Sequence, residues 1–439
     1  MKALIFLILL SQMHAAFAAN SLMVGLASKD ITPKEEELIP LGGYGSMERR
    51  EWFNFFRRRP HWRMFRPAKG VIDPIRAKVM FLDRRETSQK LLFISLDVIG
   101  VTKEMHHDLM TRLTAMGFES ASVIVSGTHT HSGPGALANN PVWEIMAMDR
   151  FQRAYYDHFL DQVVTTVTEA MAKVEESELF TISFPTHELV RNRRGSERPV
   201  YPDANLLLAR SMDGEWRGGI VNFAVHGTWH GASNMYFSSD VPGAIEKSMQ
   251  DLLTEKNSYV RLKKNADFLF INGAEGDISP HVEYHELGDQ FAKQASSFWS
   301  SMEPLIPEWE VIQKEIELGK PKINLSKCVE QKWMPKTINL GIKRWISSKT
   351  IISQIHFKNI WFLTWPGEAT TELGMMLREQ AREKGAESAW VLGLSNDHLA
   401  YFVTPEEYSA GGYEACTNFF GEQGGLKVIE AHGQLSKKF

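Results

Sequence analysis

The sequence predicts an α/β fold in which helices flank a mixed β-sheet core. Short apolar runs, typical of buried strands, alternate along the chain with longer stretches of helical periodicity. The 439 residues are 43% hydrophobic and 23% charged, which is ordinary for a globular protein and enough to bury a large core. The sequence contains no internal repeat and no Gly/Ser/Pro-rich linker. We therefore expect a single domain with insertions.

The expected elements follow one another in α/β order. Two strands, RAKVMFLD and LLFISLDVIG, precede a helix over 103–116 and the strand ASVIV. The later elements, in chain order, are a helix near 145–175, the strand GGIVNFAVH, a helix over 242–253, the strand DFLFING, a helix over 287–302, strands within 351–365, a helix opened by Gly367 and Glu368, and the strand AWVLGL. The polar stretch 319–339 is the expected surface excursion.

The N-terminus has the pattern of a secretory signal peptide. Lys2 is followed by the apolar run ALIFLILL and by the small-residue triplet that ends at Ala18. The run is shorter than the ~20 residues that a membrane-spanning helix needs. We expect a signal peptide over 1–18, cleaved near Ala18, and export of the domain 20–439 to the periplasm or the medium.

The chain has two cysteines, Cys328 and Cys416. Export would allow them to pair, but their separation in space cannot be read from the sequence, and we do not expect a bridge. Neither lies in a CxxC motif, so a cysteine metal site is not expected either.

Charge gives two indications about partners. The formal net charge of -4 provides no overall attraction to nucleic acid, which we do not expect as a partner. The segment 48–67, ERREWFNFFRRRPHWRMFRP, mixes arginines with Trp and Phe. Such a mixture suits peripheral contact with an anionic membrane surface. It equally suits an insertion whose aromatic rings pack inward while its arginines are solvated.

The motif GTHTHSGPG places His129 and His131 just after the apolar run ASVIV. In an extended chain, residues i and i+2 point to the same side, so both imidazoles would face one cleft at the end of the strand. Further polar groups follow other apolar strands, where the sites of α/β proteins form. They are His226, the stretch Asn272–Pro280, Glu368, Tyr401 and Tyr413.

Two histidines and a glutamate are a donor set that suits zinc. A catalytic zinc binds nitrogen and oxygen ligands, keeps one position open for water, and lowers the pKa of that water to about 7. Calcium would prefer oxygen ligands alone, and magnesium would keep several waters, so the imidazoles favour Zn²⁺.

Five motifs, in this order along the chain, resemble those of the neutral ceramidases: GTHTHSGPG, NFAVH, NGAEGDISP, WPGEATTELG and YFVTPEEYSAGGYE. Members of that family are exported zinc amidases that hydrolyse the N-acyl bond of ceramide to sphingosine and a fatty acid. The similarity begins near residue 25 and covers most of the chain. It implies a zinc-dependent amidohydrolase that acts on ceramide or a related N-acyl lipid.

The resemblance also implies roles for individual residues. The implied zinc ligands are His129, His226, Glu368 and Tyr401. The groups implied in the chemistry are His131 as general base, Arg193 lining the site, and Tyr413 stabilising the oxyanion. Amide hydrolysis needs a Lewis acid, a base that later protonates the leaving nitrogen, and donors to the oxyanion, so these roles are chemically consistent.

Simpler roles remain open for several of these residues. Glu368 could cap the helix that follows it. Tyr401 could orient a water molecule instead of binding the metal. Arg193, which has arginines beside it, could be a surface cation. Ser279, in GDISP, is a further candidate for a catalytic group. Because no GxSxG elbow surrounds it, we expect it to shape the loop and support the ligands.

Two aspartates, Asp97 and Asp240, could orient the ligating histidines, although Asp240 could equally cap a helix. Three positions depart from the family pattern: Gly227 stands in place of proline, His398 in place of an aromatic residue, and Ala415 in place of glycine. These changes leave the ligand set intact but put the acyl pocket in doubt.

The family's immunoglobulin-like C-terminal domain is expected to be absent. The alternative functions are a zinc hydrolase for another exported N-acyl amide or ester, and a non-catalytic lipid-binding protein on the same fold.

Overall fold

The computed structural model describes residues 22–51, 63–186, 188–254, 262–328 and 339–435. The strands of its largest sheet are β1 (Leu22–Asp30), β2 (Arg76–Arg84), β3 (Gln89–Leu96), β4 (Val123–Gly127), β5 (Glu175–Pro185), β7 (Asp203–Ser211), β8 (Trp216–Phe223), β9 (Leu262–Asn272) and β11 (Glu303–Leu305). Their order is β4-β3-β2-β1-β5-β7-β8-β9, and β11 pairs with β5. The pairs β3–β4 and β8–β9 are parallel and the others antiparallel. The sheet is mixed, as predicted.

The large sheet folds back on itself. Its end strand β9 contacts β2, β3 and β4, although these strands lie at the other end of the strand order. One bond across this contact runs from Ser95 Oγ to the carbonyl oxygen of Phe270, at 2.6 Å. An apolar cluster with members such as Met80, Phe93 and Leu269 fills the space between the two halves. The fold-back brings the loops that follow β4 and β8 together.

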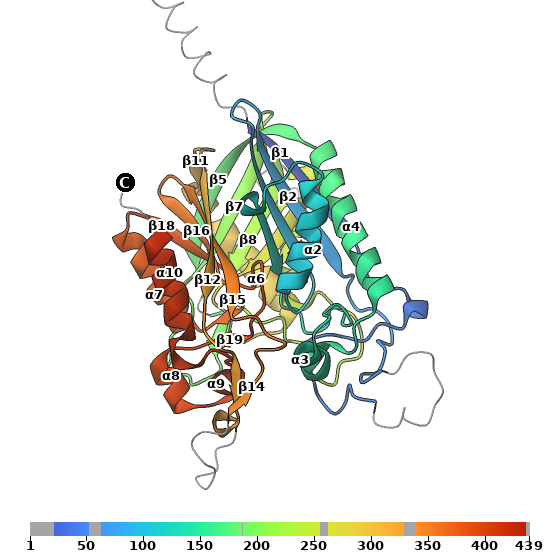
Figure 1. The fold of residues 1–439 in the computed structure, drawn as a ribbon. Helices are drawn as coiled ribbons and strands as arrows, with labels where there is room; N and C mark the ends of the chain where they lie inside the picture. Colours follow the sequence, from blue (N-terminus) through green and yellow to red (C-terminus); the bar gives the residue numbers. More distant parts are fainter. Residues whose placement is uncertain (1–21, 52–62, 187, 255–261, 329–338, 436–439) are drawn as a thin grey trace, which may run out of the picture.

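Helices cover the outer faces of both halves (Figure 1). The helices α2 (Lys103–Thr114) and α4 (Arg153–Ala172) lie on the β1–β4 half. The helices α5 (Asp240–Thr254) and α6 (Tyr284–Ser297) pack on the half formed by β7, β8 and β9. Each amphipathic helix buries its apolar face against the sheet, the usual solution for an α/β core.

A second sheet has the order β12-β15-β16-β18. Its strands are β12 (Glu310–Glu317), β15 (Lys349–Phe357), β16 (Ile360–Thr364) and β18 (Ser388–Leu392). Phe357, Phe362 and Trp390 join the apolar cluster between the halves of the large sheet. The helices α7 (Thr371–Glu383) and α10 (Gly424–Leu435) pack against this second sheet, on the side of the molecule away from α2 and α4 (Figure 1).

Two short strand pairs lie where the candidate residues meet. The strand β6 (Val190–Asn192) pairs with β10 (Ile278–Pro280), and β17 (Glu368–Ala369) pairs in parallel with β19 (Tyr401–Phe402). The short helix α9 (Tyr413–Cys416) contacts β19.

Several predicted boundaries need correction. The helix expected near 145–175 is interrupted: α3 (Pro141–Trp143) and a π-helical turn (Glu144–Met148) end at Asp149, whose φ of 64° no helix accommodates. The strand expected to reach His226 ends at Phe223. The helix expected to open at Gly367 and Glu368 begins at Thr371, because those two residues enter β17 instead.

The expectation that the cysteines stay unpaired is wrong. Cys328 and Cys416 form a disulfide, with Cα atoms 4.6 Å apart. The bridge joins the expected surface stretch 319–339 to the end of α9. This stretch contributes β13 (Lys322–Asn324). Its residues 329–338 lie outside the described residues.

In the described ends of the Arg/aromatic segment, Arg49 and Phe65 are buried, whereas Glu48 and Arg66 are exposed. Phe65 is fully buried, with the guanidinium of Arg50 4.8 Å from its ring centroid. Arg49 is 1% exposed. Residues 52–62 of this segment and the expected signal peptide lie outside the described residues. Within the described part of the chain, no helix is both long and apolar enough to cross a bilayer.

Candidate metal centre

His129 lies two residues beyond β4 in a left-handed conformation, with a φ of 66°. His129 and His131 turn their imidazoles toward the same point, with their Nε2 atoms 3.3 Å apart, but not for the predicted reason, since the chain is not extended at His129. Its Nδ1 lies 2.7 Å from the carbonyl oxygen of Ile99. Because a carbonyl only accepts, Nδ1 carries the proton and Nε2 presents its lone pair.

His226 is fixed in the same way in the loop after β8. Its Nδ1 donates to the carbonyl oxygen of Ile278 in β10, at 3.0 Å, so Nε2 is unprotonated and presents its lone pair to the cluster. The residue that follows it, Gly227, pairs with Thr130 and accepts a bond from the backbone N–H of His131. A Cβ at Gly227 would lie 2.8 Å from the Cα of Thr130, so only glycine allows this close approach.

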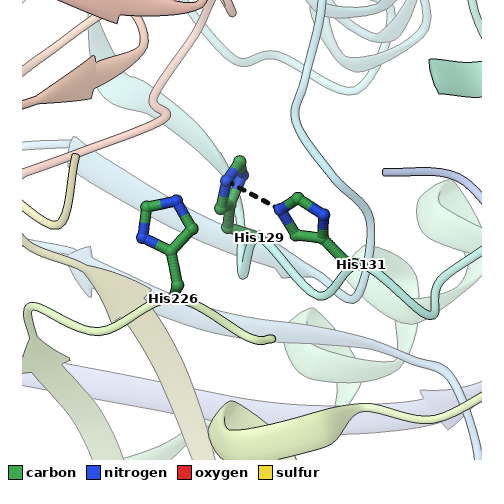
Figure 2. A group of neighbouring side chains, drawn as sticks. All are labelled: His129, His131 and His226. Atoms are coloured by element: carbon green, nitrogen blue, oxygen red, sulfur yellow. Dashed lines mark hydrogen bonds between the residues drawn. The ribbon is translucent and has the colours of Figure 1, made fainter. Parts of the chain in front are cut away.

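The three histidines converge (Figure 2). The Nε2 atoms of His131 and His129 are 3.3 Å apart, and the ring centroids of His129 and His226 are 4.8 Å apart. His131 is held through its backbone, since its carbonyl oxygen accepts a bond from Arg49 Nη1 at 2.8 Å. Its ring also lies against Tyr44, at a centroid distance of 4.4 Å.

Glu368 completes the cluster from β17. Its Oε2 lies 3.2 Å from Nε2 of both His129 and His226. Tyr401, its partner in the β17–β19 pair, places its hydroxyl 3.1 Å from Nε2 of His226. The carboxylate is therefore not the cap of the following helix, where the N-cap residue is Thr370.

These spacings suit a tetrahedral metal site. Ligands placed at zinc distances around one ion are separated by about 3.3 Å. The donor pairs His129–Glu368, His226–Glu368 and His226–Tyr401 are 3.1 to 3.2 Å apart. Among the described residues, two overlapping groups have donor atoms within 4.8 Å of one another: His129, His131 and His226, and His129, Glu368 and His398.

Burial sets the charge of the cluster. It lowers the pKa of His226 to about 4, and burial together with His129 lowers the pKa of His131 well below its usual range. Burial alone would raise the pKa of Glu368, but interactions with the histidines outweigh it and hold this pKa well below the usual range. At neutral pH, therefore, His131 and His226 are neutral and Glu368 is ionised, the states that metal binding requires.

Arg193 and Tyr413 lie beside the cluster. Arg193 Nη2 donates to the Tyr401 hydroxyl at 3.0 Å, and its Nε donates to Glu414 Oε1 at 2.8 Å. The ring of Tyr413 is 5.4 Å from that of Tyr401. Tyr413 is 60% exposed, whereas Tyr401 is 4% exposed, so Tyr413 stands at the solvent side of the site.

Comparison with known proteins identifies the family. The model for "Neutral/alkaline non-lysosomal ceramidase, N-terminal" matches residues 63–301, more than half of the chain. This chain belongs to the neutral/alkaline non-lysosomal ceramidase family. A curated relative, the neutral ceramidase of Pseudomonas aeruginosa, is 23% identical over 272 residues, which are 59% of this chain and 37% of that protein.

Other ceramidase relatives agree. Neutral ceramidase 1 of Arabidopsis thaliana is 24% identical over 54% of this chain and 30% of its own length. The chain thus spans about a third of these two relatives. A crystal structure of the neutral ceramidase from Pseudomonas aeruginosa has a TM-score of 0.79 at 19% identity, covering 95% of this chain and 74% of that one. The fold is therefore that of a neutral ceramidase.

Other predicted residues of this ceramidase-family chain lie beside the cluster rather than in it. Ser279 is in β10, and within the described residues no hydrogen bond joins its side chain to the cluster. Asp277, in the same stretch, accepts bonds from Thr371 and Asn192 and so shapes the loop. Asn272, at the end of β9, makes hydrogen bonds with both the backbone N–H and the carbonyl oxygen of Val225, and so orders the loop before His226.

Of the roles left open for Asp97 and Asp240, orienting the histidines is wrong. Asp97 binds Lys78 Nζ at 2.9 Å, because the β2–β3 register brings the ammonium group beside it. Asp240 accepts the backbone N–H groups of Trp229 and His230. The carbonyl oxygens of Ile99 and Ile278 orient the histidines instead.

Two residues of the site were not predicted as such. His398 places Nε2 3.2 Å from Glu368 Oε1, and the only sequence signal was its departure from the family's aromatic residue. Arg49 supports His131 from the Arg/aromatic segment. No pattern in the sequence connects it with the histidines.

Proposed function

We propose that this chain hydrolyses the N-acyl amide bond of ceramide, with a zinc ion held by His129, His226, Glu368 and Tyr401. The observation that carries the proposal is the convergence of two imidazole Nε2 atoms on one oxygen of Glu368, at 3.2 Å each, in a chain of the neutral ceramidase family. Neutral imidazole and carboxylate together favour zinc over calcium or magnesium. Zinc in such a site supplies a Lewis acid and lowers the pKa of water to about 7.

The surrounding residues supply the proton transfers. His131 is the general base: its neutral imidazole takes the proton of the attacking water and returns it to the amide nitrogen as the C–N bond breaks. Tyr413 donates its hydroxyl to the carbonyl oxygen as negative charge develops there. Arg193 donates hydrogen bonds to both Tyr401 and Glu414 and so holds the phenol of Tyr401 against the cluster. Ser279 stays in the supporting loop.

The substrate is proposed from the family. A related solved structure is titled "Ceramidase complexed with C2". In this chain the reaction should release a fatty acid and a sphingoid base from ceramide. We also propose that the chain is exported, with the leader 1–18 removed, which N-terminal sequencing of the exported protein would test.

The experiment is fatty acid release from ceramide by purified protein, measured before chelation, after chelation, and after zinc is restored. We expect activity to disappear with the metal and to return with zinc. A panel of other N-acyl amides and esters tests the second substrate class. Liposome binding that survives chelation, without turnover of any of these lipids, would contradict the proposal and favour a lipid-binding protein.

A further inference from the structure

The two carboxylate oxygens of Glu368 have different partners. Oε2 lies 3.2 Å from Nε2 of His129 and of His226. Oε1 lies 3.2 Å from Nε2 of His398. One oxygen thus faces the proposed ion, while the other is engaged by a histidine from a different loop. A carboxylate ligand is commonly fixed by such an outer hydrogen bond, which sets its orientation and its basicity.

The ring of His398 is locked in place. It is 4% exposed and stacks on Trp143, at a centroid distance of 4.8 Å and an interplanar angle of 18°. On another side lies Gly100, where a Cβ would come within 2.2 Å of His398 Nδ1. Gly100 follows Ile99, whose carbonyl oxygen orients His129. The backbone at Ile99 and Gly100 therefore both packs against His398 and orients His129, a proposed ligand.

The backbone on the other side of His398 is also anchored. Its N–H donates to Asp397 Oδ1 at 2.8 Å, and Asp397 Oδ2 accepts the hydroxyl of Thr350 at 2.8 Å. The backbone of His398 is thus tied through Asp397 to β15, while its ring is held by the stack on Trp143. A side chain held this firmly on one oxygen of a carboxylate restricts how that carboxylate can bind.

We propose that His398 is a positioning residue. It donates Nε2–H to Glu368 Oε1 and so makes Glu368 bind the metal through Oε2 alone. The inference rests on the proposed metal site and adds to it a residue outside the four proposed ligands. The competing role is direct ligation, because the donor atoms of His398, His129 and Glu368 lie within 4.8 Å of one another.

Two substitutions separate these roles. His398→Phe keeps the aromatic stack but removes the donor. His398→Gln restores an N–H donor but provides a poor zinc ligand. The matched control is His356→Phe: His356 is also buried and stacks on Trp361 at 3.9 Å and 10°, but its Nε2 meets the neutral amide of Gln354.

The measurement is zinc affinity by competition with a chromophoric chelator, on full-length protein whose fold is checked by circular dichroism in the metal-free state. We expect His398→Phe to weaken zinc binding about 10- to 100-fold, His398→Gln to recover most of that loss, and His356→Phe to match wild type. Cobalt substituted for zinc should give the same visible absorption in wild type and His398→Gln, because the ligand set is unchanged.

Two results would overturn the inference. Wild-type affinity in His398→Phe removes the positioning role. A Gln variant as weak as the Phe variant, with altered cobalt absorption, makes His398 a ligand. If His398→Phe fails to fold, the Gln variant alone decides between the two roles through its affinity and its cobalt spectrum. Wild-type protein that binds no zinc contradicts the proposed metal site itself, which is a distinguishable failure.

Discussion

Glu368 and Tyr401 are paired across the short parallel strands β17 and β19. Parallel neighbours point their side chains to the same side of a sheet, so the carboxylate and the phenol both reach Nε2 of His226. Tyr401 is 4% exposed and its hydroxyl bonds both His226 and Arg193. This pairing explains how residues from two distant segments enter one cluster.

Zinc should stabilise the protein through this cluster. A ligand that binds only the folded state, present at a concentration 100 times its dissociation constant, adds about 2.7 kcal/mol to the free energy of unfolding. We expect the melting temperature of the chelated protein to rise when zinc is added. His226→Ala should abolish this shift, whereas His356→Ala, which changes a histidine in β15, should retain it. A full zinc shift in the His226 variant would show that the ion binds elsewhere.

Tyr413 should act on the transition state rather than on substrate binding. Removing one oxyanion donor typically costs about 10²- to 10³-fold in kcat. We therefore expect Tyr413→Phe to lower kcat for ceramide hydrolysis with little change in KM. Tyr236→Phe, at another exposed tyrosine (43% exposed), should leave both constants unchanged. If Tyr413→Phe changes KM alone, the hydroxyl serves substrate binding instead.

Arg49 should matter for stability. Its buried guanidinium donates to the carbonyl oxygens of His131, Gly42 and Ala232. Hydrogen bonds made by charged groups contribute about 1.5 to 3 kcal/mol each, and orphaned buried acceptors add a cost. Arg49→Met should lower the free energy of unfolding by at least about 2 kcal/mol, measured in urea. The exposed neighbour Arg66 supplies the control, since Arg66→Met should change it by less than about 0.5 kcal/mol.

The disulfide should couple stability to activity. Loss of a native bridge typically costs about 2 to 5 kcal/mol. The bridge here ends on α9, the helix that begins with Tyr413. The double variant Cys328→Ser with Cys416→Ser should therefore unfold at lower urea concentration and hydrolyse ceramide more slowly. Unchanged stability and activity in that variant would mean that packing alone fixes α9.

Glu246 should give stability a pH dependence. This carboxyl, on α5, contacts Lys78 Nζ at 2.6 Å, and its pKa is raised by burial from 4.5 to about 7. Between these values the folded state binds the proton more tightly than the unfolded state. The contribution of Glu246 to the free energy of unfolding is thus full below pH 4.5 and is lost as the pH rises to about 7.

The variant Glu246→Gln tests this sign. The amide cannot ionise, so the variant does not lose this contribution. From pH 4.5 to 7, the free energy of unfolding of the wild type should therefore fall relative to that of the variant. Denaturation at a series of pH values measures it. A difference that is constant across this range would contradict the raised pKa.

The sequence predicted the parts of the fold that have strong local patterns. Buried strands such as β3 and β4 are continuous apolar runs, and their type was correct. The edge strand β12, with the sequence EVIQKEIE, buries only Ile316, so no apolar pattern marks it. The bridge between Cys328 and Cys416 depends on a spatial separation that no spacing rule provides.

In the candidate site, too, the sequence predicted residue types but not the spatial contacts between them. Residue chemistry and motif order singled out His129, His226, Glu368 and Tyr401, which the structure brings together. The partners that hold them were not predictable, because Ile99 and Ile278 act through backbone carbonyls. Asp97 looked like an orienting carboxylate because it ends an apolar run. Only the register of β2 against β3 shows that this carboxylate pairs with Lys78 instead.

We propose that one zinc ion lies between His129, His226, Glu368 and Tyr401. Anomalous diffraction at the zinc absorption edge, from crystals grown with zinc, would locate the ion. We expect a single strong anomalous peak in contact with Nε2 of His129, Nε2 of His226 and Oε2 of Glu368. Density maps with no zinc peak among these atoms, at saturating zinc, would contradict it.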